Sequence, residues 1–333
     1  MLNNARIAVL FPGQGAQYVG MAKSLYDAYE AARRVVDAAN DTLGFNLRRL
    51  MFDGPEDELI QTKNSQPAIY VASVAAWRVL AERCPALAPA AFAGLSLGEY
   101  TAFCAAGSFS YEDGLRLVRR RGEAMHEAAK RSTGTMASII GLDEATVRRV
   151  VAKAADAGLV EVANINCPGQ IVVSGNPKGV RVVVEGAKAA GAARAIELKV
   201  SGAFHSRFME PARKKLAAAL AETDVQPPAV TVIHNVTAAA ATTPELIRTH
   251  LADQCTSPVL WQASIEHLIA DGVTTFLEAG PGKVLRGLLR RINREATGLG
   301  VEDVASLEHT AEALGEVGTD TSSRAHVDER KEP

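Results

Sequence analysis

The sequence contains few cysteines, and none is placed as a metal ligand would be. Its four cysteines lie far apart in 333 residues, with no Cys-x-x-Cys pair and no histidine at ligand spacing. They are Cys84, Cys104, Cys167 and Cys255. This usage argues against a disulfide framework and against a zinc site, and it favours a reducing compartment. We therefore expect a cytoplasmic protein without a bound metal.

The sequence also lacks long apolar runs and a strong charge of either sign. No stretch approaches the roughly 20 apolar residues that a membrane span requires. The apolar run at 7–11 is too short for a signal peptide and reads instead as a buried strand. A formal net charge of −2 provides no general attraction to nucleic acid or anionic lipid. We therefore expect neither a membrane nor a nucleic-acid partner.

Strand-like and helix-like segments alternate along most of the chain. This alternation predicts an α/β fold with a mainly parallel sheet. The expected strands are 6–11, 89–93, 229–234 and 274–278. The expected helices are 22–40, 65–83, 98–106, 111–130 and 211–223. Pro67 is placed at the start of its helix, where a missing N–H is tolerated.

Residues 133–200 have a different order of elements. Their pattern is βαββαβ, which is typical of a ferredoxin-like unit, and Asp143 is a good cap for its first helix. Because α/β alternation resumes afterwards, this unit is expected to be inserted into a larger one formed by 1–132 and 201–305. Residues 306–333 are polar and lack apolar periodicity, so we expect a flexible tail there.

The pentapeptide Gly-Leu-Ser-Leu-Gly at 94–98 is the first candidate for chemistry. It follows an apolar strand and precedes a helix, the context of a nucleophile elbow that exposes its serine, here Ser96. The helix start supplies free N–H groups beside that serine, first of all from Leu97. The alternative is an ordinary turn serine between two glycines.

A serine nucleophile requires a base, and two histidines are suitably placed. His205 follows a strand end, where α/β proteins often place functional groups, and His234 ends another strand. We favour His205, although His234 remains open as a candidate or as a core-edge residue. The other histidines lie on charge-rich helical stretches, where solvent exposure is expected, or in the tail: His126, His250, His267, His309 and His326.

No acid is placed to complete a hydrolase triad. The order Ser…Asp/Glu…His would require an acid at a strand end between Ser96 and His205. The acids found there lie in the inserted unit or on helices: Asp143, Asp156, Glu161 and Glu197. A backbone carbonyl is therefore the alternative partner for the imidazole, which argues against an ordinary α/β-hydrolase.

Two further stretches carry possible binding groups. Phe-Pro-Gly-Gln-Gly-Ala-Gln-Tyr-Val-Gly at 11–20 is not a dinucleotide fingerprint, because Tyr18 stands where the third glycine is needed. It is either a plain turn or a loop that directs the N–H of Gln14 toward Ser96. In 119–121, three arginines point about 100° apart on a helix. They form a solvated face, or one of them turns inward to bind a carboxylate.

Taken together, these stretches resemble the malonyl-CoA:acyl-carrier-protein transacylases, relatives of polyketide-synthase acyltransferase domains. The resemblance covers roughly residues 5–310. It runs in order through FPGQGAQ, SQPAIY, GLSLGEYTA, RLVRRRGEAM, NINCPGQIVVSG, SGAFHS and EAGPGKVL. It implies an α/β-hydrolase-like large subdomain with a ferredoxin-like insertion, which agrees with the pattern above.

The resemblance also implies roles for individual residues. Ser96 would be acylated, His205 would be its base, and Gln14 and Leu97 would supply oxyanion N–H groups. Arg121 matches the position that binds the substrate carboxylate. Gln254 matches the residue whose backbone carbonyl orients the histidine.

Three further positions follow from the resemblance with less definite roles. Asn166 matches a position near the active site. Phe204, beside the histidine, resembles malonyl-selective members of the family. Leu95 stands where the family usually has histidine; since that histidine is not the base, we expect activity to survive with a changed pocket polarity.

The implied activity is transfer of a malonyl group from malonyl-CoA to the phosphopantetheine thiol of an acyl carrier protein, with no cofactor, by a monomer. The alternatives are a serine thioesterase or esterase, or a non-catalytic docking module. An acidic carrier would require a basic surface, for which the candidates are Lys283, Arg286, Arg290 and Arg291.

Overall fold

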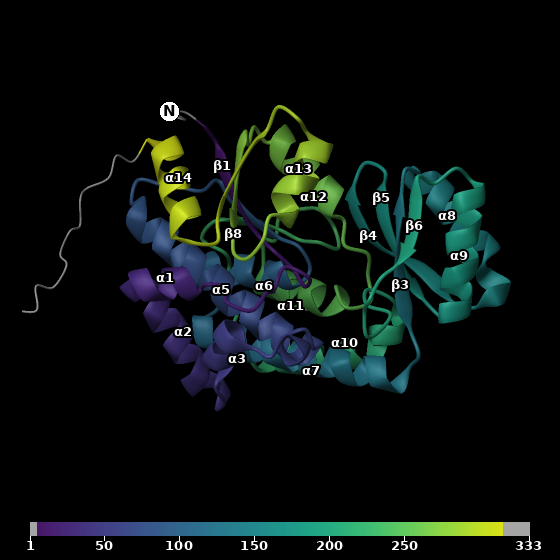
Figure 1. Cartoon of the computed structure of the whole chain (residues 1–333), viewed down its shortest axis with the longest axis horizontal. Helices are drawn as coiled ribbons and strands as arrows, with labels where there is room; N and C mark the ends of the chain where they lie inside the picture. Colours follow the sequence, from purple (N-terminus) through teal and green to yellow (C-terminus); the bar gives the residue numbers. More distant parts are fainter. Residues whose placement is uncertain (1–4, 316–333) are drawn as a thin grey trace, which may run out of the picture.

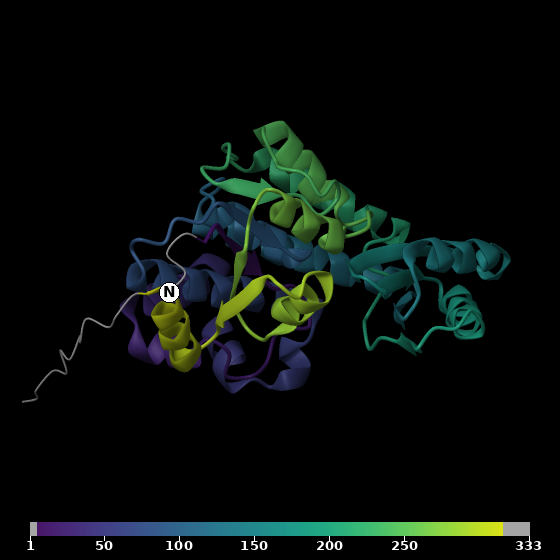
Figure 2. The same ribbon diagram turned by 90° about the horizontal axis from the view of Figure 1, so that it is seen from above.

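The computed structural model describes residues 5–315 of the chain. A large part contains a five-stranded sheet with helices on both faces, and a smaller part to one side contains a four-stranded sheet (Figure 1). The view from above shows the small sheet and its two helices beside the large part (Figure 2). Among the described residues, no helix has the length and apolarity to cross a bilayer.

The large sheet is wholly parallel, as the alternating pattern predicts. Its order is β7-β2-β1-β8-β9. The strands are β1 (Ile7–Phe11), β2 (Ala91–Gly94), β7 (Thr231–Ile233), β8 (Thr275–Ala279) and β9 (Thr297–Val301). Along β1, Val9 and Phe11 face one apolar core while Ala8 and Leu10 face another. Since both faces are buried, the strand is a continuous apolar run.

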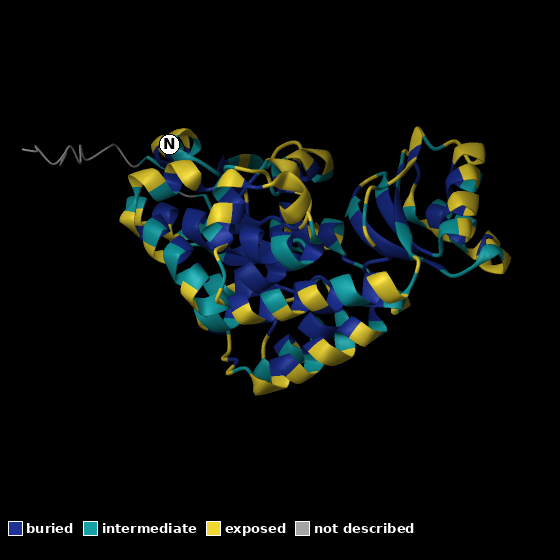
Figure 3. Cartoon of the chain, turned by 60° about the horizontal axis from the view of Figure 1, so that its bottom comes forward, coloured by how far each residue is buried: buried dark blue, intermediate teal, exposed yellow. Residues whose placement is uncertain are grey.

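Helices cover both faces of this sheet, and their buried sides form the two cores (Figure 3). On the face of the larger core lie helices α1 (Lys23–Ala28), α2 (Glu30–Leu43), α3 (Leu47–Asp53), α4 (Glu56–Leu59), α5 (Thr62–Arg83), α6 (Leu97–Ala105), α7 (Tyr111–Arg131), α10 (Glu210–Glu222), α11 (Pro244–Asp253) and α14 (Val304–Leu314). On the other face lie α12 (Trp261–Ala270) and α13 (Val284–Ile292). The short 3₁₀ turns are η1 (Ala155–Ala157) and η2 (Arg207–Met209).

The small part has the expected βαββαβ order. Its strands are β3 (Thr135–Ile140), β4 (Val160–Cys167), β5 (Gln170–Gly175) and β6 (Arg194–Glu197), with α8 (Glu144–Lys153) and α9 (Pro177–Ala189) between them. The sheet is antiparallel, in the order β4-β5-β3-β6. Asp143 caps α8 as expected, by accepting the N–H of Thr146 at 2.7 Å.

Pro67 does not lie at a helix start, because α5 begins earlier, at Thr62. A proline inside a helix leaves the carbonyl four residues before it without its usual N–H donor. Here that carbonyl belongs to Lys63, and it accepts a hydrogen bond from Arg119 Nη1 at 2.8 Å. A side chain from α7 therefore replaces the lost backbone bond, which no local pattern around the proline indicates.

The expectation of a flexible tail from 306 onward is wrong for its first residues. They belong to α14, which Asp303 and Ser306 start with a capping box. Leu307 and Ala311 are buried one turn apart, and Thr310 donates a hydrogen bond to the Gly300 carbonyl at 2.9 Å. The spacing of these few apolar positions is helical although the segment is polar overall. Residues 316–333 lie outside the described part.

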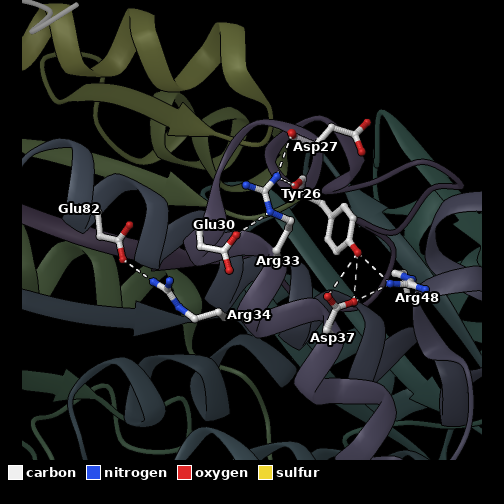
Figure 4. Close-up of polar contacts among 8 residues, drawn as sticks. All are labelled: Tyr26, Asp27, Glu30, Arg33, Arg34, Asp37, Arg48 and Glu82. Atoms are coloured by element: carbon white, nitrogen blue, oxygen red, sulfur yellow. Dashed lines mark hydrogen bonds and ion pairs between the residues drawn. The ribbon is translucent and has the colours of Figure 1, made fainter. Parts of the chain in front are cut away.

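A polar network joins the three N-terminal helices at the surface of the large part (Figure 4). The Tyr26 hydroxyl lies 3.2 Å from Asp37 Oδ1, and Arg48 Nη1 donates to both side chains, at 2.8 and 2.6 Å. Each exposed pair contributes at most about 1 kcal/mol. The network orients α1–α3 against one another and lies outside the cavity described below.

Candidate active site

Ser96 lies in a sharp turn between β2 and α6, as the elbow pattern predicts. Its backbone has φ 54° and ψ −102°, a conformation that non-glycine residues rarely adopt. The two flanking glycines make this turn sterically feasible. A Cβ on Gly94 would lie 1.9 Å from the Gly98 carbonyl carbon, and one on Gly98 would lie 2.0 Å from the Phe11 carbonyl oxygen. Both contacts are with backbone, which has little room to move.

Gly98→Ala is therefore expected to destabilise the fold by several kcal/mol, because the added Cβ would overlap backbone atoms that have little room to move. Gly287→Ala on α13 is the matched control, since a Cβ there meets nothing within 4 Å. Removing a helix-interior glycine is expected to stabilise by up to about 1 kcal/mol. Thermal and urea unfolding of the two variants measure the difference. Equal midpoints would contradict the proposed tight packing of the elbow against β1.

His205 contacts the serine directly. Its Nε2 lies 2.8 Å from Ser96 Oγ, and its Nδ1 lies 2.8 Å from the backbone carbonyl oxygen of Gln254. Because a carbonyl only accepts, Nδ1 carries the proton and Nε2 is left to accept one from the serine. The third group is thus a backbone carbonyl, and no acid is needed there. Of the acids considered above, Glu161 pairs with Arg207 and Asp143 caps α8.

The pKa of His205 is lowered to about 4, mainly by burial and secondly by the positive charge of Arg121. Hydrogen bonds to the carbonyls of Gln254 and Ser257 act in the opposite direction. The imidazole is consequently unprotonated at neutral pH, the state in which it accepts the serine proton.

His234, the other candidate base, is directed to a different partner. It is buried, and its Nδ1 lies 2.6 Å from Glu99 Oε1, whereas the histidine in contact with Ser96 is His205. The expectation of a solvent-exposed His250 is wrong, because its ring packs edge-on against His234 with centroids 4.5 Å apart. Helix α11 brings this histidine into contact with the end of β7, which local charge does not indicate.

Of the three consecutive arginines, only Arg121 turns into the protein, where it is 1 % exposed. Its Nη1 donates to Gln66 Oε1 at 2.7 Å, and its Nη2 donates to Ser96 Oγ at 3.0 Å. Nη2 also donates to Gln254 Oε1 at 2.8 Å. No carboxylate in the described part of the chain forms an ion pair with it, and its Nε has no partner there. A buried cation with only neutral acceptors is costly and is suited to an incoming anion.

A cavity of about 310 Å³ opens above these groups, between the two parts of the molecule. Gln14, Leu95 and Ser96 line it from the large part, with Phe204 and His205 from the segment that returns to it. Residues of the small part complete the wall: Met136, Asn164, Asn166, Gln170, Val172, Leu198 and Lys199. A cavity of this volume lies at the small end of the range for ligand pockets.

The remaining predicted site residues, Asn166, Gln14 and Leu97, lie at this cavity or next to Ser96. Asn166, on β4, has a buried Oδ1 without a hydrogen-bond partner. Gln14 lies in the loop after β1, with its side-chain amide 3.3 Å from Thr62 Oγ1. Leu97 buries its side chain in the core, and its N–H is the first of α6, where no intrahelical acceptor exists.

Three polar neighbours of the serine and the guanidinium were not predicted from the sequence: Gln66, Glu99 and Asn235. Asn235 holds the elbow, since Oδ1 accepts the Ser96 N–H at 2.6 Å and Nδ2 donates to the Gly94 carbonyl at 2.7 Å. Glu99 lies one helical turn beyond the serine and is completely buried, a position unusual enough for an acid to have been a signal. Asn235 and Gln66 carry no comparable local signal.

A serine in contact with a backbone-oriented imidazole and an inward-facing guanidinium lies at one cavity, an arrangement suited to acyl transfer through the serine. Consistently, residues 9–323 match the family described as acyl transferase domain, and the chain belongs to this family. It is 46% identical over 313 residues to the malonyl CoA-acyl carrier protein transacylase of Bacillus subtilis, covering 94% of this chain and 98% of the relative. It is 42% identical to the Escherichia coli K12 transacylase of the same name, over 86% and 93% of the two chains.

Solved structures give the same result. An acyl carrier protein S-malonyltransferase from Vibrio cholerae superimposes with a TM-score of 0.89 at 41% identity, covering 92% of this chain and 100% of that one. A malonyl-transacylase in complex with a type II PKS acyl-carrier protein superimposes with a TM-score of 0.90 at 39% identity, over 93% and 100% of the chains.

Proposed function

We propose that this protein transfers a malonyl group from malonyl-CoA to the phosphopantetheine thiol of an acyl carrier protein, through a malonyl-serine intermediate. The observation that carries the proposal is the Arg121 guanidinium, which is buried 3.0 Å from Ser96 Oγ and has no anionic partner among residues 5–315. A malonyl thioester has a carboxylate close to its reacting carbonyl. It therefore places a negative charge on the arginine when the carbonyl lies at the serine.

The reaction is an exchange of thiols on one acyl group. His205 Nε2 takes the Ser96 proton as the serine oxygen attacks the thioester carbonyl, and the departing CoA sulfur takes that proton from the imidazole. The carrier thiol then gives its proton to His205, attacks the malonyl-serine ester, and returns the serine as an alcohol. We assign the oxyanion to the N–H groups of Leu97 and Gln14, because the N–H of Ser96 is already bonded to Asn235.

The cavity wall selects the substrate. Arg121 favours a carboxylate over a methyl group, since acetyl would leave the buried charge unpaired. Phe204 and Leu95 present apolar surface at the reacting centre, and Asn166 offers an acceptor from the small part. We infer that Leu95, in place of the family's histidine, leaves the proton transfer intact, since the base contact is made by His205.

The arrangement into subdomains belongs to the same proposal. We assign residues 1–132 and 201–305 to an α/β-hydrolase-like subdomain and 133–200 to a ferredoxin-like one, supported by the parallel sheet, the elbow and the βαββαβ order. The placement of α14 extends the large subdomain to at least Leu314.

Because one chain supplies every group of the site, we infer that a monomer is active. The proposed steps use no metal or cofactor, and the described residues hold no metal-binding cluster.

Mass spectrometry of the intact protein tests the function against hydrolysis. Incubation with malonyl-CoA is expected to give a lasting malonyl adduct on Ser96, which phosphopantetheinylated carrier protein then removes. Rapid CoA release without an adduct would instead indicate a thioesterase. The buried guanidinium and the transacylase relatives both argue against that outcome.

Carrier docking is expected to depend on exposed cations beside the cavity mouth. Lys283 and Arg290 are exposed, with Lys283 3.6 Å from Glu302, whereas Arg286 is less exposed and is held 3.3 Å from the buried Glu278 carboxyl. Reversing charge with Lys283→Glu and Arg290→Glu is expected to slow carrier association by about tenfold at low salt, with convergence on wild type as salt screens the charges. Carrier titrations at several salt concentrations measure this. Arg34→Ala on α2 is the control, and association indifferent to salt would disprove the docking surface.

A further inference from the structure

Glu99 contacts both the residue that holds the Ser96 elbow and the residue that holds Arg121. It lies in the first turn of α6 with no exposed surface, and its two carboxylate oxygens contact three groups of other residues. Oε1 contacts His234 Nδ1 at 2.6 Å. Oε2 accepts the N–H of Asn235 at 3.2 Å and Nε2 of Gln254 at 2.6 Å. Through Asn235 it reaches the Ser96 elbow, and through Gln254 it reaches Arg121.

The contact with Gln254 determines which way that amide faces. Glu99 Oε2 accepts two donors, so the Gln254 atom facing it is the N–H₂ group, which also donates to the Ser96 carbonyl at 2.9 Å. The amide oxygen is consequently turned toward Arg121, whose guanidinium only donates. If the Gln254 amide were turned over, its N–H₂ group would face the N–H groups of Arg121, and no hydrogen bond could form between them.

The same residue also has a second role through its backbone. The Gln254 carbonyl oxygen holds Nδ1 of His205 at 2.8 Å, while its side chain holds Nη2 of Arg121 at 2.8 Å. The carboxylate-binding cation and the base are therefore attached to one residue. That residue is anchored from below by one buried carboxylate.

From this arrangement we propose that Glu99 is a positioning residue for substrate selection. By binding the N–H₂ group of Gln254, it keeps the side-chain oxygen of Gln254 facing Arg121, and so holds the guanidinium in the orientation that binds the malonyl carboxylate. The inference rests on the proposed function and adds a residue to it. Asn235 is the contrasting neighbour, since it holds the elbow backbone and contacts Gln254 only through a long hydrogen bond of 3.5 Å from Nε2, the amide atom turned away from Arg121.

The test compares kcat/KM for malonyl-CoA with that for acetyl-CoA. In Glu99→Gln the new amide offers its own N–H₂ to Gln254, so the Gln254 amide is free to turn over and oppose Arg121. The malonyl-to-acetyl ratio is expected to fall about tenfold, the size of one misdirected hydrogen bond to a charged group, mainly through a higher KM for malonyl-CoA. Asn235→Ala is expected to slow both donors by the same factor and leave the ratio unchanged. Glu222→Gln, at an exposed ion pair with Arg120, is the matched control.

A double-variant cycle separates this role from a structural one. Gln254→Met removes the side-chain link while keeping the backbone carbonyl, and it is expected to lower the ratio as well. Adding Glu99→Gln to it is then expected to lower the ratio no further. An unchanged malonyl-to-acetyl ratio in Glu99→Gln overturns the inference, even if both donors are slowed. If Glu99→Gln does not fold, an unchanged ratio in Gln254→Met overturns it. A wild-type protein that transfers no malonyl overturns the proposed function itself.

Discussion

Ser96→Ala is expected to abolish the malonyl adduct and to lower transfer to the carrier protein by about 10⁴-fold or more, the range found when a serine nucleophile is removed. The physical reason is that no other group on the cavity wall is placed to attack. Ser96 Oγ is the hydroxyl that lies 2.8 Å from the base and 3.0 Å from the guanidinium. Intact-protein mass and transfer assays measure the loss.

The control for this variant is Ser24→Ala, at an exposed serine whose hydroxyl accepts the Val304 N–H at 3.2 Å. It is expected to form the adduct as the wild type does. A malonyl adduct that persists in Ser96→Ala would show that another residue is acylated. A Ser96→Ala protein that still performed the cellular role would favour a docking module over an enzyme.

Arg121→Ala is expected to reverse the preference for malonyl over acetyl thioesters. The wild-type guanidinium gains an anion from malonyl and is left unpaired by acetyl, a difference of several kcal/mol, or roughly 10²- to 10³-fold in the ratio of kcat/KM values. Alanine removes the anion partner and leaves space for the acetyl methyl. The acyl-CoA panel measures the ratio. Arg120→Ala, the adjacent exposed arginine that pairs with Glu222, is the control and is expected to keep wild-type selectivity.

The same variant is expected to change the pH profile with a definite sign. Burial is the main reason that the pKa of His205 is about 4, and Arg121 is the second. Removing the arginine therefore raises that pKa. Since the base is lost as pH falls through its pKa, the acid limb of acetyl transfer moves from near pH 4 to higher pH. An acid limb that stays in place, together with unchanged selectivity, would refute the assigned position of Arg121 beside the base.

Much of this molecule is determined by short-range patterns. Apolar runs that alternate with helical segments predicted the parallel sheet, because strands buried on both faces have no polar positions. The glycines at 94 and 98 indicated the elbow, because only they permit the approach of α6 to β2 and β1. Where local patterns failed, the cause was a long-range contact, as with Arg119 on the Lys63 carbonyl above Pro67.

The sequence by itself determined the classes of element, the serine in its turn and, through ordered motifs, the family, whose set of reacting residues stays a prediction for this chain. The residues by themselves left open which of the three neighbouring arginines turns inward and what orients His205, and the family resemblance supplied Arg121 and Gln254 as expectations. The tertiary structure decided both points and placed Glu99 against Gln254, which no local pattern indicated. These are contacts between residues 25 to 155 positions apart. Helical periodicity gives the angle of a side chain around its own axis but not what packs against it, so partners at such separations are chosen by packing alone.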